Sequence, residues 1–475
     1  MQRTSEEDDK EIRATPTKQF FVGMMTRDIE LHDAILDLLD NCVDGIVRTI
    51  KGSATGERPY QGYWAKITLD HDHFSIEDNC GGIPPKIARN YAFRMGRPVG
   101  REDDRDMATV GIYGIGMKRA IFKMGMYSQV VSKHGSDSYQ VTIDPEWLAS
   151  DESWFLSMEE PEETLADDGT RITVSQLHSA VANRFAKDDK FIDDLYSLIA
   201  THYTYIIQKG FKVFLNGDEV VPKPLTVMRS DFEAYAEGRG IMPYVYEGEQ
   251  DGVSVRLVVG FLARPPGESE IEDEMERPRR SKEEAGWTVI ANERVVLYKD
   301  KSRVTGWGTG NVPAYHPQFI TVSGVVEFRC DQAEKLPINT TKRGLEAGDE
   351  LYLHVRDFMM EGMRIFTQHT NRWKQHKEEE LALFESARRE PVRDVAKSIP
   401  EDRWTRPRNS PTERKFVPDL PRPKTAEHGT RQIRFARPLS QIKTVAEYLF
   451  EDPDAEPRDV GEKCFDLLLD EARDQ

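Results

Sequence analysis

Hydrophobic positions recur at three- and four-residue steps over residues 27–50, which predicts one amphipathic helix. Two alternating runs follow at Trp64–Leu69 and Phe74–Glu77, and the polar segment between them predicts a hairpin. Further strand-like runs lie at residues 129–132, 138–143 and 170–177. Residues 84–110 are rich in charge, proline and glycine, so they predict a long internal loop. This order of elements predicts an α/β layer.

A second, separate α+β unit is predicted from about residue 180. An amphipathic helix leads to a hairpin whose turn is Asn216-Gly217, a dipeptide typical of tight two-residue turns. Strands are then predicted at residues 253–262, 287–298 and 324–329. A long helix begins near Leu351. Residues 402–443 contain eleven basic, four acidic and six proline residues, so they predict an extended basic linker before a helical C-terminus.

The composition narrows the class of protein. Lysine and arginine total 65 against 83 aspartate and glutamate residues, and the formal charge of -18 disfavours a surface that binds nucleic acid throughout. No apolar run approaches the roughly 18 residues of a membrane helix, and the acidic N-terminus lacks the pattern of a secretory signal. The four cysteines are far apart, so neither a disulfide framework nor a zinc site is implied. We expect a soluble, cytoplasmic protein.

Three polar motifs are candidates for chemistry. On the first helix, Asp37, Asn41 and Asp44 share one face, opposite the apolar stripe. A solvated helix face would explain this feature taken alone. After the second hairpin strand comes Asp78, an acceptor that suits the exocyclic amine of adenine and would repel the carbonyl of guanine. Gly81 and Gly82 follow it and would let the backbone approach the base, although an ordinary turn has the same composition.

The third motif is the glycine-rich segment from Gly111 to Lys118, which runs into a helical pattern. Glycines that open a helix leave backbone N–H groups free for phosphate. A Walker A loop requires lysine where Met117 stands, and the dinucleotide fingerprint requires glycine where Arg119 stands, so neither pattern fits. A lone glycine cluster is weak evidence, whereas the order and spacing of all three motifs make a specific signal.

In this order the motifs resemble the GHKL ATPases, the superfamily of DNA gyrase B, the ninety-kilodalton heat-shock chaperone, MutL and MORC. The matching segments are Asp37-Leu-Leu-Asp-Asn41, Asp78-Asn-Cys-Gly-Gly82, a lid at about residues 84–110, Gly111–Gly116, and Gly169-Thr170. The resemblance covers about residues 20–180 and is closest to the MORC- and MutL-like branch. It implies a Bergerat-type α/β sandwich that binds ATP and Mg2+.

The resemblance also implies site roles. Asn41 would bind Mg2+, Asp78 the adenine amine and Ile83 the base face, with Thr170 supporting Asp78. Asp37 would be catalytic, by orienting the attacking water. The other implied ATP-binding residues are Gly82, Gly111, Gly114, Ile115, Gly116, Met117 and Lys118.

Two departures from the family pattern bear on activity. Position 37 is Asp where the family usually has Glu, and one methylene less shortens its reach by roughly 1.5 Å. A misplacement of that size can cost on the order of 10²-fold in rate, so hydrolysis is expected to be slow unless the backbone compensates. Cys80 replaces the first glycine of its motif, and Gly81 is expected to supply the conformation that only glycine tolerates.

The segment from Leu336 to Gly344 resembles the loop by which a transducer domain projects a lysine onto the γ-phosphate, which implies that Lys342 is catalytic, with Arg343 as the second candidate. Taken alone, two basic residues in a polar loop would be explained by solvation. We expect an α+β protein whose chain divides into six segments. They are a tail at residues 1–19, the ATPase domain at 20–180, a transducer-like domain at 181–370, a helical extension at 371–401, the basic linker at 402–443 and a C-terminal helical segment at 444–475.

The expected function is an ATP-hydrolysing switch or clamp that dimerises when ATP binds. The MORC-like resemblance adds an expectation of DNA or a separately encoded effector as partner, in DNA transactions or defence against foreign DNA. A scaffold that senses ATP without turnover remains an alternative because of Asp37. A chaperone is disfavoured because only about 100 residues follow the transducer-like domain, and a histidine kinase because only about 20 residues precede the ATPase domain.

Overall fold

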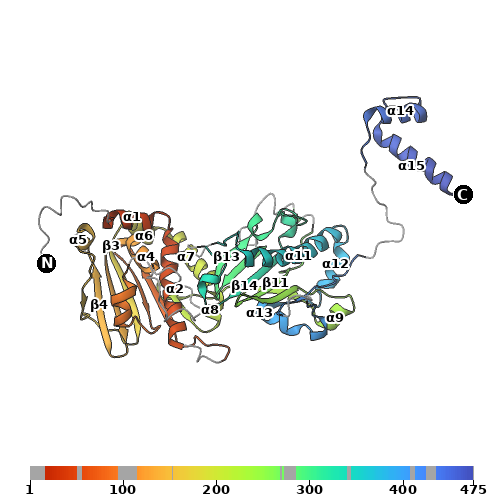
Figure 1. Cartoon of the computed structure of the whole chain (residues 1–475). Coiled ribbons are helices and arrows are strands. Elements are labelled where there is room, and N and C mark those ends of the chain that lie inside the picture. Colours follow the sequence, from red (N-terminus) through yellow and green to blue (C-terminus); the bar gives the residue numbers. More distant parts are fainter. Residues whose placement is uncertain are drawn as a thin grey trace. The chain divides into compact units, whose positions relative to one another are not determined.

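The structure is a computed structural model that describes residues 16–50, 56–94, 115–151, 153–267, 270–271, 285–339, 344–406, 412–423 and 435–473. The chain divides into two compact units, Met1–Pro423 and Lys424–Gln475. Within the larger unit, two mixed sheets each carry helices (Figure 1). The α+β fold class is therefore confirmed.

The first sheet has eight strands in the order β5-β4-β3-β6-β2-β1-β7-β8. Its neighbours pair antiparallel except for β1 and β7, which are parallel. The strands are β1 (Trp64–Leu69), β2 (His73–Asp78), β3 (Gly125–His134), β4 (Asp137–Ile143), β5 (Met158–Glu159), β6 (Gly169–Leu177), β7 (Lys212–Leu215) and β8 (Asp218–Glu219). The hairpin and the strands expected from alternation are present.

Helices cover one face of this sheet and share a hydrophobic core with it (Figure 1). They include α1 (Lys18–Arg27), α2 (Leu31–Ile50), α4 (Gly116–Met124), α6 (Ser179–Lys187), α7 (Asp189–His202) and α8 (Thr204–Gln208), while α3 (Pro85–Ile87) and α5 (Pro145–Ala149) are short. A π-helical turn, Ala88–Ala92, follows α3. The single helix expected over residues 27–50 is α2, which begins at Leu31. Helix α1 precedes it and was not expected, and Ile29 between the two helices is buried in the core.

The first domain, defined as the part built on this sheet, extends past the boundary expected near residue 180. Phe191, Leu195 and Ile199 of α7 pack into the same core as α2. Strands β7 and β8 then add to the edge of the sheet through the predicted Asn216-Gly217 turn, where both residues have positive φ. The apolar face of α7 is buried against this sheet, which assigns the segment to the first domain.

The second domain follows β8 and is built on a six-stranded sheet with the order β13-β12-β14-β11-β10-β16. Its strands are β10 (Tyr244–Gln250), β11 (Val253–Phe261), β12 (Gly286–Ala291), β13 (Arg294–Asp300), β14 (Val322–Arg329) and β16 (Arg414–Phe416). Strands β9 (Thr226–Arg229) and β15 (Arg388–Pro391) form a separate pair. Only β12 and β14 run parallel in the six-stranded sheet as the structure describes it.

Long helix α11 (Glu350–Arg372) packs on one face of the second sheet, as its predicted apolar stripe requires. A smaller cluster on α13 (Val392–Val395) and Trp404 packs with Tyr205 of α8 and with residues of the second sheet such as Val258 and Val325. The remaining helices are α9 (Phe232–Ala236), α12 (Lys377–Phe384) and the 3-10 turns Arg303–Thr305, Pro317–Phe319, Ala333–Lys335, Ala396–Ser398 and Glu401–Arg403. Both faces of the sheet therefore contribute to a core.

Two expectations for the second domain are wrong. The single strand expected over residues 287–298 is the hairpin β12–β13, because the chain reverses at Asn292 and Glu293. The basic stretch expected to be an extended linker from residue 402 is partly folded, because β16 pairs with β10 and Trp404 is buried.

The basic side chains of that folded stretch are ion-paired with acids. Arg414 pairs with Glu247 and Glu401, and Lys415 pairs with Glu361. Because these charges are already compensated and Trp404 is buried, Arg414, Lys415 and Trp404 give no support to a contact with the DNA partner that the resemblance implies.

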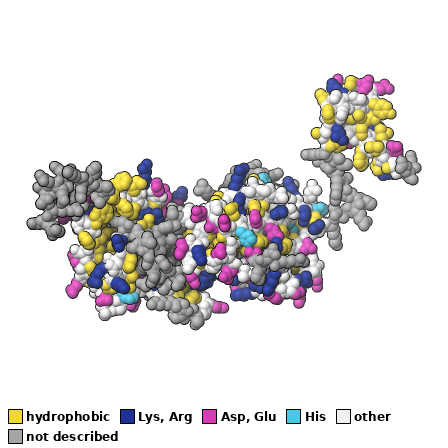
Figure 2. Space-filling view, in the orientation of Figure 1, with side chains coloured by type: hydrophobic (Ala, Val, Ile, Leu, Met, Phe, Trp, Pro, Cys, Tyr) yellow, Lys and Arg dark blue, Asp and Glu magenta, His cyan; other side chains and the backbone are white. Residues whose placement is uncertain are grey.

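The smaller unit contains two described helices, α14 (Leu439–Phe450) and α15 (Pro457–Arg473), as the C-terminal periodicity predicts. Its described residues include Ala446 and Val460 as buried contacts, while several large apolar side chains are exposed (Figure 2). Across the described residues of both units, no helix combines the length and apolar character that crossing a membrane requires.

We predict that Gly362→Ala destabilises the second domain. A Cβ at this position of α11 would collide with Val259 Cγ1 and lie 3.0 Å from the Tyr244 ring. Overpacking of this kind costs about 1–3 kcal/mol, more than the gain in helix propensity. Gly23→Ala in α1 is the matched control, since a Cβ there meets nothing within 4 Å and should be neutral or stabilising. Chemical unfolding of both variants measures the difference, and equal stabilities would contradict the packing assignment.

Candidate functional site

Asp78 lies at the end of β2 with its carboxyl held by several donors. The Cys80 backbone N–H donates to Oδ1 at 2.7 Å, and the Cys42 thiol donates to Oδ2 at 3.4 Å. The backbone of Thr170, its register partner on β6, also hydrogen-bonds this carboxyl. These contacts fix the orientation of an acceptor at the edge of the sheet.

Burial raises the pKa of Asp78 to about 6, although the hydrogen bonds from Cys80, Cys42 and Thr170 oppose the shift. Burial and the nearby Asp78 raise the pKa of the Cys42 thiol, so this thiol stays protonated and remains a donor. The carboxyl is therefore ionised at neutral pH and gains its proton as the pH falls through about 6. The sequence did not predict that Cys42 or Cys80 donates a hydrogen bond to Asp78, since no sequence spacing is typical of such a donor.

The turn after Asp78 confirms the expectation for Cys80 and Gly81. Gly81 and Gly82 have φ values of 99° and 66°, while Cys80 is outside the left-handed region. A Cβ on Gly81 would collide with Thr49 Oγ1, and one on Gly82 with the carbonyl oxygen of Lys133. Both positions therefore require glycine for conformation and for space.

Ile83 and Thr170 lie next to this turn. The Ile83 N–H donates to Ser132 Oγ at 2.7 Å, and its carbonyl accepts from the Tyr139 hydroxyl at 2.8 Å. Thr170 is mostly buried, and its hydroxyl lies 3.5 Å from Ser132 Oγ. Asp78, Gly82, Ile83 and Thr170 are thus brought together from two strands and one turn, although Thr170 reaches Asp78 through its backbone.

The polar face of α2 is not a solvated surface. Asp37 and Asp44 are 8% and 4% exposed, whereas Asn41 between them is exposed. Helical residues so deeply buried need partners, and Arg119 Nη2 of α4 lies 2.5 Å from Asp37 Oδ2. This ion pair was not predicted, because Arg119 and Asp37 are 82 positions apart in the sequence.

Helix α4 begins beside Asp37. A Cβ on Gly116 would lie 3.4 Å from the Asp37 Cβ, so the first turn of α4 is adjacent to this carboxylate. No side chain caps this helix at Ile115. Its first backbone N–H groups are therefore suited to an anionic ligand.

The side chains of the first turn point inward. Met117 and Lys118 are 8% and 2% exposed, and Lys118 Nζ donates to the Ala92 carbonyl at 2.8 Å. Burial lowers the pKa of Lys118 to about 8. Here the Lys118 ammonium joins α4 to the segment at the start of the expected lid. Gly111, Gly114, Lys342 and residues 95–110 of that lid lie outside the described residues.

Two further charged residues meet at α2, and neither was expected in a site. Arg294 of β13 places Nε 2.9 Å from Asp40 Oδ1. The Tyr203 hydroxyl lies 2.6 Å from the same oxygen and 2.8 Å from the Leu36 carbonyl oxygen, so its one proton is shared between these two acceptors. The second domain therefore contacts α2 at the residue directly before Asn41.

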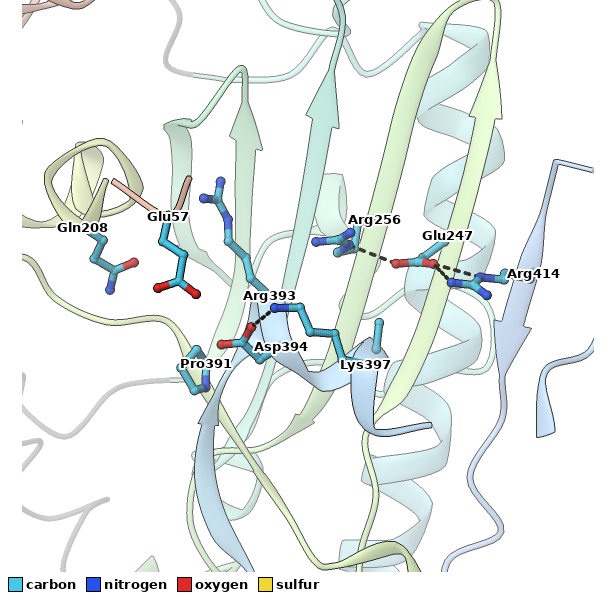
Figure 3. A pocket seen from close by; sticks show the side chains of 10 residues that line it. Glu57, Gln208, Glu247, Arg256, Pro391, Arg393, Asp394, Lys397 and Arg414 are labelled. Atoms are coloured by element: carbon cyan, nitrogen blue, oxygen red, sulfur yellow. Dashed lines mark hydrogen bonds and ion pairs between the residues drawn. The ribbon is translucent and has the colours of Figure 1, made fainter. Parts of the chain in front are cut away.

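A separate charged cavity of about 670 Å³ lies in the second domain and at the Glu57 loop (Figure 3). Glu247 lies between Arg256 and Arg414, and Lys397 contacts Asp394 (Figure 3). The charged side chains that line the cavity are therefore largely compensated by one another. None of Asp37, Asn41 or Asp78 lines this cavity. Its chemistry is therefore distinct from that of the motif residues.

The motif residues fit a nucleotide with Mg2+. Mg2+ prefers oxygen ligands and usually keeps only one or two from the protein alongside phosphate and water. The exposed Asn41 amide offers such an oxygen near Asp37 and the start of α4. No group of three or more His, Cys, Asp or Glu residues that could hold a metal by itself occurs among the described residues.

Comparison with known proteins agrees with this geometry. Residues 29–190 match the family model described as histidine kinase-, DNA gyrase B-, and HSP90-like ATPase. The match is to the superfamily and does not distinguish its branches. No curated protein matches the chain. The matched residues contain α2, the Asp78 turn and the start of α4, so the chain carries a GHKL-type ATP-binding domain.

Proposed function

We propose that the chain binds ATP with Mg2+, hydrolyses it and changes shape between nucleotide states. The observation that carries this proposal is the half-buried Asp78 carboxyl, held by donors beside two glycines at which a side chain would collide. An ionised carboxylate accepts the adenine amine and repels the carbonyl of guanine. Ile83 would contact the base face, with Thr170 supporting Asp78.

The phosphates would bind at the start of α4. In this proposal the backbone of Ile115, Gly116 and Met117 supplies N–H donors, together with Gly111 and Gly114. Asn41 would hold Mg2+, whose chemistry is to neutralise phosphate charge and fix its geometry. Lys118 would contribute to this site by holding the start of the lid against α4, since its ammonium already donates to the Ala92 carbonyl.

Asp37 would orient the attacking water, and Lys342 would stabilise charge on the γ-phosphate. Catalysis of phosphoryl transfer is mostly positioning and electrostatic stabilisation, so these roles suffice. Arg119 now pairs with Asp37, and its Nε is buried without a hydrogen-bond partner among the described residues. Phosphate would provide that partner, so we propose that Arg119 turns from Asp37 to the nucleotide and releases the carboxylate.

The same ion pair favours the alternative function, a sensor that binds ATP with little turnover. Asp37 is one methylene shorter than the usual Glu, and Arg119 occupies its Oδ2. If Arg119 stays in place when ATP binds, Asp37 cannot orient water and the protein would report ATP by its shape. Phosphate release distinguishes the two functions.

The switch would act through nucleotide-dependent self-association. Helix α1 packs on α4, where Lys123 Nζ donates to the Thr26 carbonyl at 3.1 Å. Phe20 and Met24 of α1 are 62% and 57% exposed, and hydrophobic side chains gather over this part of the surface (Figure 2). An exposed apolar patch beside the phosphate-binding helix is suited to a second copy whose docking depends on nucleotide.

We predict that ATP binds more tightly than GTP and that ATP affinity falls as the pH drops through about 6. Protonation of Asp78 removes the ionised acceptor, because burial raises its pKa to about 6. Asp78→Ala should cost about 1.5–3 kcal/mol of binding. Calorimetry at pH 7.5 and 5.5 measures these effects. ATP itself also titrates in this range, and Asp78→Asn is the control for that effect. This variant should lose the part of the pH dependence that comes from Asp78. Equal affinity for ATP and GTP would refute adenine recognition by Asp78.

We predict that Asp37→Asn binds ATP but releases phosphate on the order of 10²-fold more slowly, because water loses its orienting carboxylate. Asp193→Asn, an exposed change on α7, should leave the rate unchanged. Lys342→Ala should also slow release. Steady-state phosphate release with a parallel binding measurement tests this. Full activity in both site variants would show that the catalytic residues are wrong, whereas a wild type that binds ATP without turnover would favour the sensor.

We predict that a non-hydrolysable ATP analogue doubles the mass of the protein in light scattering. Phe20→Ser combined with Met24→Ser should prevent this change, because it removes the exposed apolar contact area of α1. Tyr448→Ser on α14 is the control, since that side chain is even more exposed but lies in the other unit. A monomer at micromolar concentration with the analogue bound would contradict nucleotide-dependent self-association.

A further inference from the structure

The turn between β12 and β13 has an unusual backbone. Asn292 and Glu293 have φ values of 44° and 72°, which places two consecutive residues other than glycine in the left-handed region. Asn tolerates this conformation and Glu does so rarely. Asn292 Nδ2 donates to the Cys330 carbonyl at 2.9 Å, and its Oδ1 accepts from the Cys330 N–H at 3.0 Å. The tip is therefore held rigidly on the second sheet.

The strained tip residue, Glu293, binds the first domain. The Tyr60 hydroxyl donates to Glu293 Oε2 at 2.9 Å, and Lys209 Nζ forms an ion pair with Oε1. Burial raises the pKa of Glu293, but the charge and hydrogen bond of Lys209, together with the charges of Arg393 and Arg329, hold it below its usual range. Surroundings that hold such a backbone in place are more typical of a functional contact than of an ordinary surface turn.

The next residue, Arg294, reaches α2. Its side chain is 4% exposed and that of Asp40 is 1% exposed. The guanidinium lies over the Tyr203 ring, 4.4 Å from its centroid, while Nε contacts Asp40. An ion pair this deeply buried depends on close geometry, because each charge has lost its water.

Asp40 lies between the two residues of α2 that the proposed function places at the nucleotide. Asp37 is one helical turn before it, and Asn41 is the next residue. A displacement of Asp40 therefore moves both side chains with the helix. Loss of the Arg294 charge would also leave a buried carboxylate uncompensated next to the proposed phosphate and Mg2+ site.

From these contacts we propose that Arg294 is a positioning residue for the nucleotide site, and that the β12–β13 tip links ATP binding at α2 to the second domain. This inference rests on the proposed ATP site. It identifies the Arg294–Asp40 contact as the one through which the second domain responds to bound ATP. Energetic coupling between two sites is reciprocal, so ATP binding must stabilise the tip as much as the tip stabilises bound ATP.

The test compares Arg294→Gln with Arg229→Gln. Arg229 forms a buried ion pair with Glu390 that joins β9 to β15 inside the second domain, so its loss reports general destabilisation. We expect Arg294→Gln to raise the Kd for ATP about tenfold, and Arg229→Gln to leave it unchanged at a matched loss of thermal stability. Adding Asp40→Asn to Arg294→Gln should restore part of the affinity, because the uncompensated charge is removed.

Tyr203→Phe provides a milder variant if Arg294→Gln does not fold. It removes the hydroxyl whose proton is shared between Asp40 and Leu36 while keeping the ring under Arg294, and a smaller rise in Kd is expected. Amide hydrogen exchange provides the reciprocal readout. ATP should slow exchange at the tip residues in wild type and in Arg229→Gln, and not in Arg294→Gln.

The outcomes separate the two proposals. If wild type binds ATP and Arg294→Gln binds it equally well, with the same protection of the tip, the coupling is wrong and the ATP site stands. If Arg229→Gln weakens ATP binding as much as Arg294→Gln, the effect is general destabilisation and the coupling is again wrong. If wild type does not bind ATP, both the site and the coupling are overturned.

Discussion

Helix α2 carries acidic side chains into the interior of the protein, and the arrangement around it depends on how their charges are compensated. Asp37 is paired with Arg119 from α4, and Asp40 with Arg294 from the second domain. A buried carboxylate without such a partner costs far more than a surface one, because it has lost its water. The two ion pairs therefore fix where α4 and the β12–β13 hairpin lie relative to α2.

The Asp78 carboxyl is stabilised in a different way from those of Asp37 and Asp40. It receives backbone and thiol donors rather than a cation, and burial still raises its pKa to about 6. Because the pKa of Asp78 is higher in the folded protein than in the unfolded chain, its protonated form favours folding. This contribution to the free energy of unfolding is fully present below about pH 4 and is lost as the pH rises through about 6. At neutral pH the carboxylate is thus maintained at some cost in stability, which is typical of a binding site.

Local motifs were sufficient to predict the conformation of the Asp78 turn and the polar face of α2, because each depends on short-range chemistry. The Asp78 turn needs glycines at Gly81 and Gly82, and the predicted conformations are confirmed. The polar face of α2 follows from helical spacing, and the burial of Asp37 and Asp44 on it excludes the solvated-face explanation. In contrast, the Asp37–Arg119 and Asp40–Arg294 pairs join residues 82 and 254 positions apart, and no spacing rule connects them.

The sequence by itself determined strands β1, β2, β3, β4 and β6 of the first sheet, the long helices α2 and α11 and the order of the nucleotide motifs, since alternation, helical spacing and turn residues act over a few positions. Only the tertiary structure decided that residues 287–298 reverse at Asn292, that α7 and β7 belong to the first domain, and that the basic stretch after residue 402 adds a strand. In these three cases a segment with an ambiguous local pattern is fixed by what it buries or pairs with. The partner surface is distant in the sequence and exists only once the chain has folded.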